Sequence, residues 1–140
     1  MGLAATLVLS GCNSDRDRST AEENLHKWQD KGPPSYVYVL ETGCLCRNNG
    51  VVRVVVTDAQ VTSAIELDSG DAVPGKTMTE LLQSAVSEAS RDNDDFEASY
   101  DSELGYLKHL AVDHTSASDD EYSERVTCFG EGTDDDVCPG

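Results

Sequence analysis

The fold is decided by residues 77–91, TMTELLQSAVSEASR, which separate two groups of strand-like segments. Apolar side chains recur three and four positions apart in this stretch, and that spacing predicts an amphipathic helix. Thr77 and Glu80 match a capping box, in which each side chain satisfies a free backbone N–H group of the other residue. We therefore expect a helix from Thr77 to about Arg91 that lies across a sheet.

Strand-like segments stand on both sides of this helix, three before it and three after it. Each one is rich in β-branched or aromatic residues or alternates in polarity, which predicts antiparallel strands. Asp58-Ala59 occupies the place of a two-residue hairpin turn, where glycine would suit position 59 better because such turns need positive φ. The six segments are residues 36–41, 51–57, 61–68, 96–100, 108–114 and 122–129.

A shorter helix is expected at residues 20–31. Thr20 and Glu23 match another capping box, and Gly32-Pro33-Pro34 ends the segment. The predicted fold class is therefore α+β, an antiparallel β-sheet with two helices packed on one face, in the order α-βββ-α-βββ.

Length and charge limit the functions that the chain can have. Its 140 residues suffice for one domain with a core of its own. Its 27 acidic and 10 basic side chains give a net charge of -17, which repels phosphate backbones. No apolar run approaches the roughly 18 residues that a membrane-spanning helix needs. A nucleic-acid-binding protein and a transmembrane protein are thus not expected.

The N-terminal residues resemble a lipoprotein signal. Residues 3–12, LAATLVLSGC, are apolar up to Leu9 and end in a cysteine, after which the chain becomes polar. In bacterial lipoproteins such a cysteine is acylated and becomes the first mature residue, and each buried CH₂ of its acyl chains contributes about 0.8 kcal/mol. We expect Cys12 to be this residue. Two alternatives stay open: the loose myristoylation pattern of residues 1–6, and a buried first helix that contains an unmodified cysteine.

A lipid anchor at Cys12 predicts both the domain organisation and the location. A secretory signal normally begins with basic residues, which Met1-Gly2 does not supply, so we expect the true start to lie upstream of Met1. We expect an exported protein anchored to the cell envelope, on its periplasmic or extracellular face. The expected parts are a signal segment at 1–12, a polar tether at 13–19, one α+β domain at 20–129 and a mobile acidic tail at 130–140.

Export would place the other cysteines in an oxidising compartment, where disulfides are favoured. Cys44, Cys46, Cys128 and Cys138 allow three connectivities. Cα atoms two positions apart in a strand are roughly 6.6 Å apart, near the upper limit for a disulfide. We therefore favour a pairing in which the C-x-C segment bonds through one cysteine to Cys128 and through the other to Cys138. A redox dithiol or soft-metal site at the C-x-C pair stays open as an alternative.

The order of several short motifs resembles the uncharacterised bacterial envelope family catalogued as domain of unknown function 6174. The resemblance covers about residues 20–129 and implies an exported, often lipid-anchored protein without an assigned reaction. Two positions depart from the family pattern, since Ala59 replaces a turn glycine and Leu107 replaces a proline. The matching elements are Trp28, Tyr36-x-Tyr38-x-Leu40, Cys44-x-Cys46, the valine-rich hairpin of residues 52–61, Thr79-x-x-Leu82, Tyr100-Asp101, Gly105-Tyr106 and Asp113.

Two further groups of side chains have more than one interpretation. Asp92-Asn93-Asp94-Asp95 resembles part of a calcium loop but lacks its central glycine and distal glutamate, so a solvated acidic surface is favoured and weak cation binding stays open. Five aromatic residues could line a ligand groove, although a place in the core is favoured. They are Trp28, Tyr36, Tyr38, Tyr100 and Tyr106.

No motif for hydrolysis, metal-dependent catalysis or phosphate binding occurs in the chain. We therefore expect no catalytic residues and no cofactor, and a non-catalytic binding or accessory role. The expected partners are a membrane, reached through the lipid anchor, and an unidentified protein or small-molecule ligand. The alternative function is that of a thiol-disulfide or metal-handling protein centred on Cys44 and Cys46.

Overall fold

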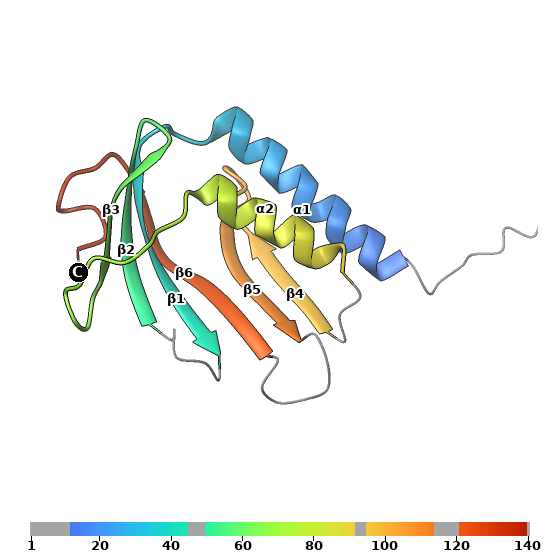
Figure 1. Cartoon of the computed structure of the whole chain (residues 1–140). Coiled ribbons are helices and arrows are strands. Elements are labelled where there is room, and N and C mark those ends of the chain that lie inside the picture. Colours follow the sequence, from blue (N-terminus) through green and yellow to red (C-terminus); the bar gives the residue numbers. More distant parts are fainter. Residues whose placement is uncertain (1–11, 45–49, 92–94, 114–120, 140) are drawn as a thin grey trace, which may run out of the picture.

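The computed structural model describes residues 12–44, 50–91, 95–113 and 121–139 (Figure 1). Its order of one helix, three strands, one helix and three strands confirms the α+β class expected from the sequence. The elements are α1 (Cys12–Lys31), β1 (Tyr36–Cys44), β2 (Gly50–Thr57), β3 (Gln60–Glu66), α2 (Met78–Ala89), β4 (Asp95–Tyr100), β5 (Leu107–Asp113) and β6 (Glu121–Glu131).

The six strands form one antiparallel sheet in the order β3-β2-β1-β6-β5-β4. Consecutive strands are neighbours within each half of the chain. β1 and β6 lie side by side at the centre and join the halves, while β3 and β4 form the edges. α2 lies in the connection that leads from one edge of the sheet to the other.

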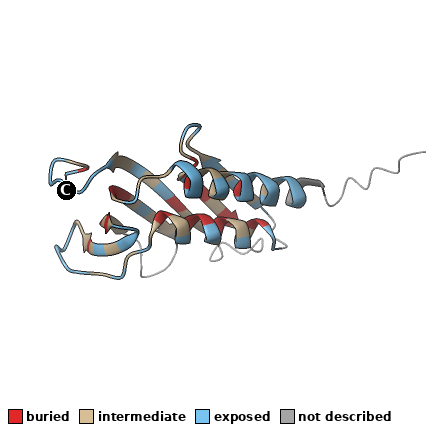
Figure 2. Cartoon of the chain, turned by 90° about the horizontal axis from the view of Figure 1, so that it is seen from above, coloured by how far each residue is buried: buried red, intermediate tan, exposed pale blue. Residues whose placement is uncertain are grey.

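Both helices lie side by side on one face of the sheet (Figures 1 and 2). The capping box of α2 is present: Thr77 Oγ1 accepts a hydrogen bond from the Glu80 N–H at 3.2 Å, and Glu80 Oε1 accepts one from the Thr77 N–H at 3.0 Å. The expected helix at residues 77–91 is thus confirmed, with Thr77 as its cap. Its buried residues are Met78, Leu81, Leu82, Ala85 and Ala89.

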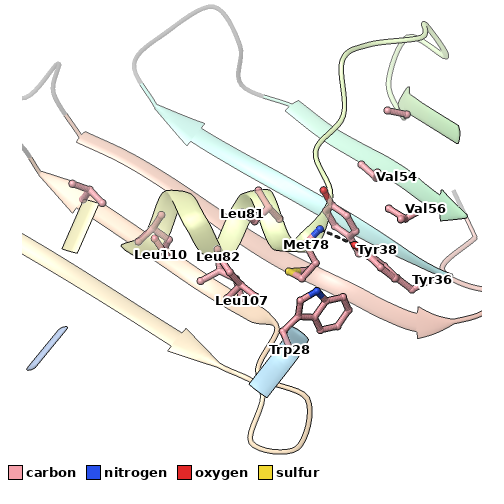
Figure 3. Close-up of a cluster of buried hydrophobic side chains, with 13 residues drawn as sticks. Trp28, Tyr36, Tyr38, Val54, Val56, Met78, Leu81, Leu82, Leu107 and Leu110 are labelled. Carbon is pink, nitrogen blue, oxygen red and sulfur yellow. Dashed lines mark hydrogen bonds between the residues drawn. The ribbon is translucent and has the colours of Figure 1, made fainter. Parts of the chain in front are cut away.

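The main hydrophobic core lies between the helices and the sheet (Figure 3). Trp28, Tyr36 and Tyr38 are buried in it, with 5%, 3% and 0% of their surfaces exposed. The Trp28 and Tyr36 rings meet edge to face with their centroids 5.0 Å apart. Tyr100 and Tyr106 are partly buried and pack against the same core. The aromatic residues at positions 28, 36 and 38 therefore belong to the core and do not line a groove.

The hydroxyl groups of two core tyrosines hold the start of α2. The Met78 N–H donates a hydrogen bond to the Tyr36 hydroxyl at 2.7 Å, and the Tyr38 hydroxyl donates to the Lys76 carbonyl. Burial raises the pKa of Tyr36 to about 12, and burial also raises the pKa of Tyr38. Both hydroxyl groups therefore stay protonated at neutral pH, and these bonds persist there.

The expected hairpin turn between β2 and β3 is confirmed. Asp58 and Ala59 have φ values of 50° and 66°, as a two-residue turn that follows the twist of its strands requires. Alanine is strained at such a φ value because its Cβ approaches neighbouring backbone atoms.

The expected start of α1 at Thr20 is wrong. α1 begins at Cys12, so residues 13–19, the expected tether, are helical. Arg18 Nη2 lies 3.9 Å from Asp15 Oδ1, and Arg18 Nε lies 3.9 Å from Glu22 Oε1. Ion pairs three and four positions apart favour the helical conformation. Neither of the described helices is long and apolar enough to cross a lipid bilayer.

Candidate functional site

The five cysteines stand at different places along the chain. Cys12 is the first residue of α1, Cys44 is the last residue of β1, and Cys46 lies outside the described residues. Cys128 and Cys138 form a disulfide with an S–S distance of 2.05 Å and a Cα–Cα distance of 5.7 Å. The favoured connectivity is therefore wrong, because these two cysteines bond to each other and not to the C-x-C segment.

A reversal of the chain after β6 makes this bond possible. Gly132 has a φ of 87°, which suits glycine, and the residues after it return to Arg53 of β2. Arg53 Nε donates a hydrogen bond to the Cys138 carbonyl at 2.7 Å, and Arg53 Nη2 donates to the Val137 carbonyl at 2.8 Å. A Cβ at Gly130 would lie 2.6 Å from Val137 Cγ1, so glycine permits this close approach. A turn, an arginine and a covalent bond together fasten the tail.

The fastened tail helps to form a second hydrophobic cluster, on the face of the sheet opposite the helices. Val37 is 0% exposed, Val39 is 6% exposed and Cys138 is 5% exposed. Valine side chains on a face without helices would otherwise contact water. The expected mobile tail at 130–140 is therefore wrong for two parts of this stretch. Residues 130 and 131 belong to β6, and Val137 and Cys138 pack against β1 and β2. We call Val37, Val39 and Cys138, with the side chains around them, the outer cluster.

One charged side chain is buried among the described residues. Glu124 of β6 is 3% exposed and lies opposite Thr42 of β1 and Leu110 of β5, on the face that the helices cover. Its carboxylate is hydrogen-bonded to the Tyr122 hydroxyl. Burial is the main cause that raises the pKa of Tyr122, and its hydrogen bond to Glu124 raises it further. The tyrosine therefore stays protonated, and its hydroxyl donates a hydrogen bond to the carboxylate.

Sequence reasoning missed Glu124, although a signal was present. Tyr122, Glu124 and Val126 alternate along one strand, so the period of two already places the glutamate on the same face as two apolar neighbours. Acidic residues are numerous throughout the chain, and this abundance concealed Glu124, the one acidic residue that is buried among those the structure describes.

The other candidates from the sequence do not assemble into a site. Among the side chains of residues 15–43, 50–91, 95–113 and 121–139, no three His, Cys, Asp or Glu residues are placed to hold a metal ion. Residues 92–94 of the calcium-like segment lie outside the described residues, and Asp95 begins β4. The described residues therefore offer two features for a function, the fastened tail and the buried carboxylate.

These features define a small α+β protein with a disulfide-fastened tail and one carboxylate in its core. The chain belongs to a family of unknown function, DUF6174, whose sequence profile matches residues 20–131. No curated protein and no solved structure matches the chain. The matched residues contain α2, all six strands and Cys128, and they end before Cys138.

Proposed function

We propose that the protein is exported, anchored to the cell envelope through acylated Cys12, and non-catalytic, with a binding or accessory role. The observation that carries this proposal is the Cys128–Cys138 disulfide, which fastens the tail over Val37 and Val39. Structural disulfides persist in oxidising compartments and are rare where thiol buffers keep cysteines reduced. The fastened tail therefore suits a protein that functions outside the reducing interior of the cell.

The position of α1 supports an anchor at Cys12. The helix is continuous from Cys12 to Lys31, and Ala21 is buried with 0% exposure. At a rise of about 1.5 Å per residue, the helical segment between Cys12 and Ala21 is roughly 13 Å long. An acylated Cys12 would thus hold the domain close to the membrane surface through a short helical spacer.

Mass spectrometry of the full-length gene product, expressed in a bacterium, tests the proposal. We expect a membrane-bound mature chain that begins at an acylated Cys12, and a cross-linked Cys128–Cys138 peptide in the digest prepared without reductant. The Cys12→Ser variant is the control and should stay unacylated. An uncleaved and unacylated wild-type chain with reduced cysteines in the cell interior would overturn the proposal.

A second candidate function is thiol-disulfide exchange or metal handling by Cys44 and Cys46. The pairing of Cys128 with Cys138 favours this candidate because it removes the long-range partners of the C-x-C pair. With Cys12 acylated and Cys128 bonded to Cys138, Cys44 and Cys46 can form a disulfide within the chain only with each other. A direct bridge between them is near the geometric limit for a disulfide, and strained disulfides are the readily reduced ones.

Stepwise reduction followed by alkylation separates the two candidates. If the C-x-C pair is a redox site, Cys44 and Cys46 become alkylated at a mild reducing potential that leaves Cys128–Cys138 intact. If the pair handles metal, the protein purified without chelator contains a soft metal, and the Cys44→Ser/Cys46→Ser variant does not. Equal resistance of all four cysteines, without bound metal, would eliminate this second function.

A further inference from the structure

We propose that the inner face of the sheet beside Glu124 binds an organic cation that has an apolar body, such as a primary alkylammonium ion. The proposal deepens the binding role proposed above by naming a class of ligand. It rests on the placement of one buried carboxylate beside an apolar row that the helices leave partly uncovered.

The apolar row crosses three neighbouring strands. Leu40 of β1 pairs with Val52 of β2 on one side and with Val126 of β6 on the other. All three side chains face the helices, since they pack against the main core, and yet each one keeps part of its surface exposed. This contrasts with the next row, where Tyr38 and its neighbour Val54 are 0% and 1% exposed. We call Leu40, Val52 and Val126 the open apolar row.

Glu124 lies beside the open apolar row, on the same strand as Val126 and two positions before it. In the register, its neighbour on β1 is Thr42, which follows Leu40 on the same face. A cation that contacts Glu124 would therefore lie with its body along Leu40 and Val126. The open apolar row supplies contact area for that body, while the carboxylate selects the charge.

The carboxylate has a hydrogen-bond donor but no cationic partner among the described residues. The Tyr122 hydroxyl donates to it, whereas the ion pairs of the described chain join Arg18 to Asp15 and Glu22, and Arg91 to Glu88. A buried carboxylate is costly unless a positive charge or several donors compensate for lost water. An ammonium group supplies both the charge and three donors.

The chemistry of the region favours an organic cation over a metal ion. A divalent cation of the calcium type needs six to eight oxygen ligands, and the described residues contain no group of three acidic, histidine or cysteine side chains suited to a metal. The apolar row beside Glu124 offers no ligand atoms to a metal ion, but it can contact a hydrocarbon chain. The net charge of -17 also attracts cations toward the protein.

Calorimetric titration of the full chain with n-hexylammonium tests the site. The Cys12→Ser background removes acyl chains and detergent, so the result does not depend on the lipid anchor, and failure of either proposal can be recognised separately. n-Hexanol supplies the same body without the charge. We expect saturable binding of n-hexylammonium. The affinity for n-hexanol should be lower by at least about tenfold, because n-hexanol lacks the charge-assisted hydrogen bond to the carboxylate.

Two glutamate variants with the same change in charge locate the binding. Glu124→Gln keeps the shape of the side chain and an acceptor for Tyr122, and should weaken n-hexylammonium binding by at least about tenfold. Glu97→Gln, on an exposed position of β4, should leave the affinity unchanged. If Glu124→Gln does not fold, Val52→Thr replaces it, and we then expect a several-fold loss because the row becomes more polar.

Three results would overturn the proposal. The first is the absence of saturable n-hexylammonium binding by the Cys12→Ser protein without further changes. The second is equal affinity of that protein for n-hexanol and n-hexylammonium. The third is full n-hexylammonium affinity in the folded Glu124→Gln variant or, where that variant does not fold, in Val52→Thr.

Discussion

β1 contributes alternate residues to two hydrophobic clusters that are closed by different means. Tyr36 and Tyr38 point toward the helices and belong to the main core, whereas Val37 and Val39 point away and belong to the outer cluster. The core is covered by two helices that lie side by side (Figure 2). The outer cluster is covered by a short tail that one disulfide and one arginine hold.

The comparison shows what a covering segment needs when it has no regular secondary structure. A helix satisfies its backbone groups internally, so its apolar side can cover a sheet without further help. The tail cannot do so, and Arg53 donates to the carbonyls of Val137 and Cys138 instead. Its small apolar area is supplemented by a covalent bond, which limits the conformations of the unfolded chain.

The largest effect is expected in the main core. Leu110 is 0% exposed, so Leu110→Ala should lower the free energy of unfolding by about 3 kcal/mol through lost transfer energy and a cavity. Denaturant titration followed by Trp28 fluorescence measures this loss. Lys108→Ala, at an exposed position of the same strand, is the control and should change stability by less than about 0.5 kcal/mol.

The comparison further requires that the cost of Leu110→Ala be the same with and without reductant, because the main core does not depend on the disulfide. A much smaller cost in the reduced protein would show that the two clusters form one cooperative unit, and the distinction between them would then fail.

Removing the disulfide should have the next largest effect. The bond joins residues ten positions apart, and closing a loop of that size contributes about 2.5–3 kcal/mol in the chain-entropy description. Cys128→Ala/Cys138→Ala should lose roughly this amount while its Trp28 fluorescence stays that of the folded protein. If the native fluorescence disappears in water, the outer cluster supports the core more than the comparison allows.

Arg53 should contribute less than the disulfide. Two of its hydrogen bonds to tail carbonyls are charge-assisted and partly buried, so Arg53→Met should cost about 1–2 kcal/mol. Arg125→Met, at an exposed position of β6, removes the same charge from the same face and should cost less than about 0.5 kcal/mol. Equal losses in the two variants would mean that net charge matters here and that the carbonyl contacts do not.

The regular elements could be predicted from the sequence because their periods are local. The capping box at Thr77 and the alternation from Tyr36 onward lie within short windows, and the structure confirms α2 and the six strands. The turn at Ala59 was also found, since two-residue hairpins leave few places for the reversal. The start of α1 was missed because the helix continues before the expected cap Thr20, where ion pairs around Arg18 favour it.

The outer cluster could not be predicted in the same way. Nothing local indicates that Cys138 packs against Val37, because the contact depends on a chain reversal after β6 and on Arg53, which is far away in sequence. A composition rich in aspartate and glycine instead indicates a mobile tail. Glu124 is an intermediate case, because alternation places it inward while its charge suggests the surface.

The smallest effect is expected from the charges of the tail. Asp134, Asp135 and Asp136 are exposed, and Arg53 contacts backbone carbonyls of the tail, including that of Asp134 at 3.5 Å. Asp134→Asn/Asp135→Asn/Asp136→Asn should therefore change the free energy of unfolding by less than about 0.5 kcal/mol. Any change should be a gain, because the chain carries a net charge of -17 and repels itself. A loss as large as that of Arg53→Met, abolished by high salt, would show that ionic attraction holds the tail and that the carbonyl contacts do not.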